Sequence, residues 1–232
     1  MPQNDKGLSS LLIQEESLKL ERNLLKDLAA DALRDHISIG RIPEGTKLTE
    51  REVSQMLGIS RMPVHDALIM LEAEGLVVRR ANARYVISLT EKDVRDLHVA
   101  RKAIEREAVV LAATNINTEN RATLYASLEA LEGAIASEDR HLSAKCDMAL
   151  HQTICDQANN KYLSELLRSL MGVIFVLNDR VRAHNKQREM DPRNEHRALV
   201  EHIVNGDAVG AATMMEMHLD SALTGALATF RI

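Results

Sequence analysis

The stretch TEREVSQMLGISRMPVHDALIMLEAEG, from Thr49 to Gly75, predicts two short helices joined by a tight turn. Gly58 supplies the backbone freedom that a sharp turn needs, and the hydroxyl of Ser60 is expected to cap the second helix. Pro63 falls in the first turn of that helix, where its missing N–H costs no intrahelical hydrogen bond. Such a helix-turn-helix presents the start of its second helix to the major groove of DNA.

Two β-prone runs follow, at residues 76–80 and 85–88, and the short segment 81–84 between them predicts a two-stranded wing. Acidic and basic residues balance across this region, so DNA binding is expected from arginines clustered around the turn and the wing. The candidate DNA-contacting residues are Arg51, Arg61, Met62, His65, Asn82 and Arg84.

The composition describes an ordinary globular chain with room for two domains: 232 residues, 45% hydrophobic and 27% charged. Its net charge of −5 excludes a protein that coats nucleic acid by bulk electrostatics. The sequence has no long apolar run and no signal peptide pattern, so we expect a cytoplasmic protein without a membrane partner. Cys146 and Cys155 lack metal-site spacing and are expected to be reduced core residues.

The pattern divides the chain into a tail with an extra helix (1–22), a winged helix-turn-helix domain (23–89) and a helical domain (90–232). Thr90 and Asp93 have the spacing of a capping box at the start of the last domain. Short connections there predict an antiparallel bundle of about six helices, so the fold class is mainly α. The expected helices are 91–113, 119–136, 139–157, 161–184, 193–205 and 208–229.

Polar residues interrupt the apolar stripes of this bundle. Arg101 takes the place of an apolar residue in the first bundle helix, and a buried arginine needs either an internal carboxylate or an anionic ligand. Asp147 and His151 are four residues apart and face the same side of one helix. His196 and His218 lie at similar distances on either side of the Gly206 turn, so an antiparallel hairpin brings them level.

One carboxylate and three imidazoles suit a divalent transition metal, with zinc first and nickel, manganese or iron also open. The alternative is a purely structural polar core in which the same side chains satisfy one another.

The run from Ile39 to Leu89, centred on LTEREVSQMLGISRMPVHDALIMLEAEGLV, resembles the winged helix-turn-helix of GntR-family transcription regulators. That resemblance implies that Arg51 and Arg61 contact the operator. His65 stands where the family usually has a third arginine, and Arg84 stands where the wing often has glycine. Both departures concern the affinity and base preference of the DNA interface.

The segments CDMALHQTICDQANNKYL and EHRALVEHIVNGD, with MEMHLD after them, resemble the FadR-type C-terminal (FCD) ligand-binding domain. The resemblance implies that Asp147, His151, His196 and His218 hold the metal. It also implies that Arg101 helps to hold an acidic effector. Asn178 and Arg182, one turn apart, are weaker candidates for the same pocket.

The sequence therefore predicts a homodimeric regulator, with repression the expected direction, that binds two-fold symmetric operator DNA and a small carboxylate. A metal sensor with no organic effector is one alternative. A metal-dependent hydrolase is another, but the sequence offers no general base beside the cluster, and we expect no enzyme activity.

Overall fold

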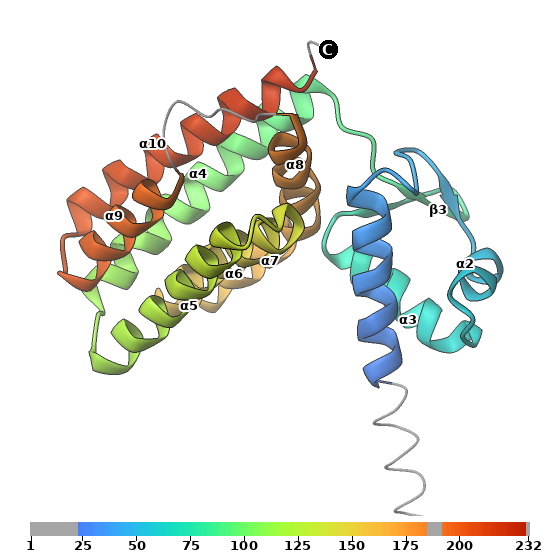
Figure 1. Ribbon diagram of the computed structural model, residues 1–232, viewed down its shortest axis with the longest axis horizontal. Helices are drawn as coiled ribbons and strands as arrows, with labels where there is room; N and C mark the ends of the chain where they lie inside the picture. The colour runs from blue at the N-terminus through green and yellow to red at the C-terminus, as the bar shows by residue number, and fades with distance from the viewer. Residues whose placement is uncertain (1–22, 185–191, 231–232) are drawn as a thin grey trace, which may run out of the picture. The chain divides into compact units, whose positions relative to one another are not determined.

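The computed structural model describes residues 23–184 and 192–230, and these fall into two units, Met1–Ile87 and Ser88–Ile232 (Figure 1). Because the two units are separate bodies, each is described on its own. The predicted tail and extra helix at 1–22 lie outside the described residues. Along the described ranges, no helix is long and apolar enough to cross a membrane.

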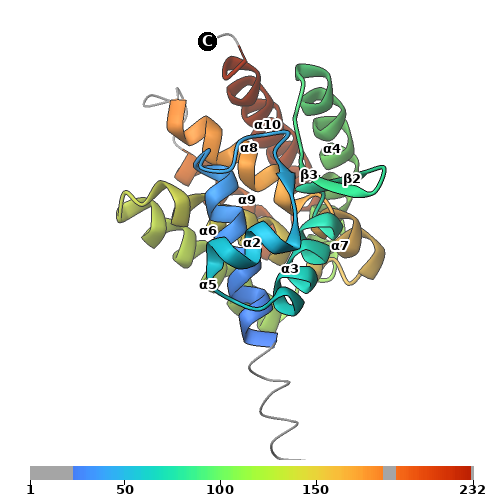
Figure 2. The same cartoon turned by 90° about the vertical axis from the view of Figure 1, so that its right-hand side faces the viewer.

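The described part of the N-terminal unit contains a helix over residues 23–38, two further helices and a three-stranded sheet, and Figure 2 shows these elements in one view. Its labelled elements are β1 (Lys47–Leu48), α2 (Glu50–Leu57), α3 (Arg61–Ala73), β2 (Val77–Arg80) and β3 (Ala83–Val86). Leu33, Leu68, Leu71 and Leu76 are fully buried and form the centre of this unit.

The helix-turn-helix has the predicted turn. Gly58 adopts a left-handed conformation with φ of 67° and caps α2, which is a conformation that glycine tolerates best. The predicted side-chain cap at Ser60 was wrong, because its hydroxyl makes no capping hydrogen bond. Pro63 at the third helical position has no N–H, so one of the two usual donors to a capping side chain is missing.

The wing has three strands where the sequence predicted two. The extra strand β1 pairs with β3, which also pairs with β2, and all three are antiparallel. The turn is only Ala81 and Asn82, with Ala81 at a positive φ of 51°, so the hairpin has a two-residue loop. Arg84 consequently lies inside β3, opposite Arg79, and not in the turn.

The described part of the C-terminal unit has seven helices, and the predicted capping box of Thr90 and Asp93 is confirmed. The helices are α4 (Glu91–Thr114), α5 (Thr118–Ala136), α6 (Arg140–Gln157), α7 (Lys161–Arg168), α8 (Met171–His184), α9 (Pro192–Val204) and α10 (Ala208–Ala228).

The single helix predicted over 161–184 is two helices, α7 and α8, separated at Ser169 and Leu170. The N–H of Leu170 bonds to the carbonyl of Leu167, which closes a tighter turn than the α-helix has. Neither residue of the break is glycine or proline, and Gly172 lies inside α8. The two helices differ in packing, because α7 contacts α4 and α6 whereas α8 contacts α6 and α10.

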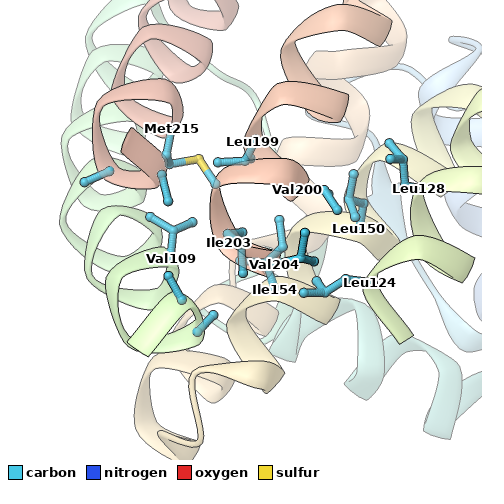
Figure 3. Packing of buried hydrophobic residues seen from close by; sticks show 14 of the residues in the cluster. Val109, Leu124, Leu128, Leu150, Ile154, Leu199, Val200, Ile203, Val204 and Met215 are labelled. Atoms are coloured by element: carbon cyan, nitrogen blue, oxygen red, sulfur yellow. The ribbon is translucent and has the colours of Figure 1, made fainter. Parts of the chain in front are cut away.

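The core of the bundle is built from α4, α5, α6, α9 and α10 (Figure 3). Leu150 and Ile154 of α6 meet Leu199 and Ile203 of α9 there, and all four are almost completely buried. Four of these helices, α4, α6, α9 and α10, also carry buried polar residues of the bundle. The fixed packing of the core therefore determines how closely those polar residues approach one another.

Candidate functional site

Three buried histidines from three helices meet in the C-terminal unit. His151 comes from α6, His196 from α9 and His218 from α10, and one nitrogen of each lies within 4.8 Å of the others. The Nε2 atoms of His151 and His218 are 3.2 Å apart, and the ring centroids of His196 and His218 are 4.5 Å apart. The tertiary fold thus collects nitrogen donors that are far apart in the sequence.

Asp147 lies beside the histidines, one turn before His151 on α6. Its Oδ1 atom is 3.0 Å from Nε2 of His196. Burial alone would raise the pKa of Asp147, but the positive charges of His196, His151 and Arg182 hold that pKa well below its ordinary value. The carboxylate therefore stays ionised and offers its oxygens as ligands.

Two buried glutamates that the sequence analysis missed accept hydrogen bonds from the histidines. The Nδ1–H of His151 donates to Oε2 of Glu105, and the Nδ1–H of His218 donates to Oε2 of Glu195 at 2.8 Å. An ionised carboxylate can only accept, so each ring must carry its proton on Nδ1. A hint existed in the sequence, since Glu105 follows Arg101 by four residues on the same helix face.

This arrangement fits a cation between the rings. With both Nδ1 atoms protonated, the Nε2 atoms of His151 and His218 face each other at 3.2 Å, and either a proton shared between them or a metal ion stabilises that contact. Burial, and then the charges of His196 and His151, lower the pKa of His218 well below its usual range, which disfavours a proton there. Two nitrogens that bind one tetrahedral zinc are about 3.3 Å apart.

Arg101 has an internal partner, which was one of the two predicted possibilities. Its Nε donates to Oε1 of Glu105 at 2.6 Å, and both side chains are buried. Burial opposes ionisation of Glu105, but the charges of Arg101 and His151 lower its pKa to about 2. Glu105 therefore links Arg101 directly to the histidine cluster.

A pocket opens beside this cluster between α4, α8 and α10, with about 340 Å³ of empty space when its open mouth is included. Its polar lining residues are His98, Arg101 and Asn178. Asn178 also donates from Nδ2 to Oδ2 of Asp147 at 2.8 Å, so it belongs to both the pocket and the cluster. His98, whose Nε2 lies 2.9 Å from Asp220, was not among the predicted residues.

The structure also locates Arg182 and Cys155, and Cys155 is the buried, reduced core residue that the sequence predicted. Arg182 does not line the pocket; its Nη2 is 3.4 Å from Oδ1 of Asp147. Cys155 is buried, and burial followed by the charge of Glu105 raises its pKa to about 12. A protonated thiol is a poor metal ligand, so the cluster relies on imidazole and carboxylate.

The candidate DNA-contacting residues divide into two groups. Arg51, Arg61, Met62 and Asn82 are exposed on α2, on the first turn of α3 and at the wing turn. Arg84, in contrast, is only 12% exposed, with its Nε 3.0 Å from Glu72 and its Nη1 3.2 Å from Glu50. The same Glu50 lies 2.7 Å from Nδ1 of His65.

The position of Arg84 differs from the sequence-based expectation, which placed it in the segment between the two wing strands. Because β3 begins at Ala83, two residues earlier than predicted, the Arg84 side chain lies against α2 and α3. It connects the wing to both helices of the helix-turn-helix.

Both units match known families. Residues 25–87 match "Bacterial regulatory proteins, gntR family", and residues 96–221 match "FCD domain". The chain is 29% identical over 145 residues to the uncharacterized HTH-type transcriptional regulator YdhC of Bacillus subtilis, a match that covers 61% of this chain and 64% of that protein.

A longer match extends over most of the chain. The probable D-xylose utilization operon transcriptional repressor of Paenarthrobacter nicotinovorans is 28% identical over 209 residues, which covers 89% of this chain and 91% of that protein. Among solved structures, McbR/YncC of E. coli has the same fold with a TM-score of 0.74, at 21% identity over 89% of this chain and 98% of that one.

Proposed function

This chain belongs to the GntR family of bacterial transcription regulators and carries an FCD domain, and from that premise we propose that it is a repressor controlled by a metal-anchored carboxylate effector. Proteins of this family bind operator DNA and typically act as dimers. For this chain we propose specific metal ligands, an effector pocket and a set of contacts that couples the two.

The proposed metal ligands are Asp147, His151, His196 and His218. The observation that carries this assignment is the approach of two Nε2 atoms to 3.2 Å while both Nδ1 atoms donate to buried carboxylates. Carboxylates behind ligating histidines fix the tautomer and raise the basicity of the ligand nitrogen. A metal ion between the rings would satisfy both Nε2 atoms at once. Zinc is the first candidate, because imidazole and carboxylate ligands suit it.

The proposed effector is a small carboxylate held by Arg101 beside the metal. Arg101 faces the pocket and is joined to His151 through Glu105, so a change at the anion propagates to the metal ligands. Asn178 makes a second link, since it lines the pocket and donates to Asp147. A bound metal would supply an electrophilic contact for a carboxylate oxygen.

The proposed operator interface is the exposed first turn of α3 together with Arg51 and the wing turn. We propose that Arg61 and Arg51 contact guanines or phosphates, and that two copies bind a two-fold symmetric site. Effector binding would act by favouring one arrangement of the paired DNA-binding units over another, which requires different affinities for the two arrangements. Since operator DNA is the partner, the cytoplasm is the proposed compartment.

The metal assignment is tested by zinc binding to the full chain and to two variants on the same helix, His196→Ala and His202→Ala. His202 is partly exposed and pairs with Asp207, so it is the matched control. We expect His196→Ala to abolish stoichiometric zinc binding and His202→Ala to retain it. Equal zinc binding by both variants would refute the assignment.

The regulatory part is tested with operator duplexes selected from random DNA, measured by fluorescence anisotropy with and without zinc and carboxylic acids. Release of the operator by an acid only in the zinc-loaded protein supports the proposal. Release that depends on zinc alone would favour the alternative of a metal sensor. The pocket beside Arg101 is the observation against that alternative, because a sensor of the ion itself needs no such space.

A further inference from the structure

The pocket beside Arg101 has an uneven chemical lining. Apart from His98, Arg101 and Asn178, every residue that lines it is apolar. The large apolar side chains are Val94 and Leu97 from α4, Ile174 and Leu177 from α8, and Leu219 and Leu223 from α10. A ligand of this pocket must therefore bring apolar surface to most of the wall and polar atoms to a small part of it.

The pocket extends along α4 and α10 from the level of Arg101 to that of Val94. α4 and α10 are antiparallel, because Lys102 pairs with Asp220 and Arg106 pairs with Glu216. In this register Arg101 is level with the Leu219–Ala222 turn, whereas Val94 is level with Ala228 at the end of α10. Seven residues separate Val94 from Arg101 on α4, which corresponds to roughly 10 Å along the helix axis.

Arg101 offers the donors for one charged group. Its Nε is used by Glu105, but its terminal Nη groups have no hydrogen-bond partner among residues 23–184 and 192–230. Two N–H groups of a guanidinium match the two oxygens of a carboxylate. The far end of the pocket offers no comparable partner, so a second charged or strongly polar group on the ligand would lose its hydration there.

Hydroxyl groups along the ligand would meet the same apolar wall. A hydroxyl that loses its water and finds no hydrogen-bond partner weakens binding by roughly tenfold or more. A sugar acid, with a hydroxyl on nearly every carbon, is therefore a poor match for this lining. A hydrocarbon chain of the same length is a good match, because each methylene that enters the wall contributes favourably.

We propose that the effector of this protein is an aliphatic monocarboxylate with an unsubstituted chain of about six to eight carbons, its carboxylate on Arg101 and its tail along α4, α8 and α10. The inference rests on the proposed function, since it presupposes a carboxylate effector at this site. It adds the chemical class of that effector, and it excludes polyhydroxylated acids.

The test is calorimetric titration of the full-length, zinc-loaded protein with acetate, butyrate, hexanoate, octanoate and gluconate. Hexanoate and gluconate have equal carbon number and equal charge, so they differ in the hydroxyl groups. We expect the affinity to rise by up to about fourfold for each added methylene until the pocket is full. Gluconate should bind at least a hundredfold more weakly than hexanoate.

Two variants of α4 test the position of the tail. Leu97 lines the pocket, whereas Val99 is 67% exposed and does not line it. Leu97→Gln should weaken hexanoate binding about tenfold and leave acetate binding unchanged, and Val99→Gln should alter neither. Equal effects of both variants on hexanoate would contradict the proposed position.

Failure of this inference differs from failure of the proposed function. If gluconate binds as tightly as hexanoate, or if affinity is flat from acetate to octanoate, the effector class is wrong while the carboxylate site stands. If no acid binds and Arg101→Ala changes nothing, the carboxylate effector itself is refuted and this inference falls with it.

Discussion

The Nε2 atoms of His151 and His218 lie 3.2 Å apart in the bundle, each on a ring whose Nδ1–H donates to a buried carboxylate. The two helices that carry these residues, α6 and α10, are held in place by the apolar core. The short separation is therefore built into the fold, and it is a separation at which a cation stabilises both nitrogens. The site therefore depends on the two carboxylates that accept these hydrogen bonds as well as on the imidazole rings.

Glu195→Gln should weaken zinc binding about 10- to 100-fold, because the neutral amide no longer strengthens His218 as a donor. The affinity is measured by competition with a chromophoric chelator. The control is Glu216→Gln on α10, where the glutamate is partly exposed and pairs with Arg106. An unchanged affinity in Glu195→Gln would show that the carboxylate behind His218 does not support metal binding.

Removal of the metal should destabilise one unit and not the other. All the proposed ligands lie in the unit that begins at Ser88. A ligand at a hundred times its dissociation constant stabilises the native state by about 2.7 kcal/mol, so zinc should raise the melting temperature of that unit by several degrees. Differential scanning calorimetry with zinc and after chelation measures this. A shift confined to the transition of the N-terminal unit would contradict the site.

Arg84→Ala should destabilise the N-terminal unit by about 1–2 kcal/mol, since Arg84 is only 12% exposed and bonds both Glu50 and Glu72. Arg80→Ala is the matched control, because Arg80 is exposed on β2 of the same hairpin. It should change stability by no more than about 0.5 kcal/mol. Urea unfolding measures both, and equal effects would show that the contacts of Arg84 contribute nothing to stability.

Lowering the pH should weaken the ion pairs that Glu72 makes with Arg79 and Arg84. The hydrogen bond from Arg79, opposed by partial burial and reinforced by Arg84, lowers the pKa of Glu72 below its ordinary 4.5. A carboxyl with a lowered pKa in the folded state contributes its full stability above the unfolded pKa and loses it as pH falls through the folded pKa. Glu72→Gln should therefore be less stable than the parent at pH 7 and lose less stability on acidification. If the urea midpoints of Glu72→Gln and of the parent change in parallel from pH 7 to pH 3, ionisation of Glu72 does not contribute to stability.

The sequence by itself determined the elements that local rules control. The turn at Gly58, the capping box of Thr90 and Asp93, and most of the helices follow from residue spacing and backbone preference. The meeting of His196 and His218 also follows from local information, because a short hairpin and a fixed rise per residue set their heights.

Only the tertiary structure decided the remaining features. The break between α7 and α8, at Ser169 and Leu170, has no glycine or proline within it, and the two helices differ in packing, because α7 contacts α4 whereas α8 contacts α10. The spacing of Glu105 from Arg101 hints only that it faces inward, and the roles of Glu105 and Glu195 depend on which histidine another helix brings to them. The location of Arg84 depended on where the hairpin turned. Contacts between distant segments depend on packing of the whole unit, and spacing along one element does not contain that information.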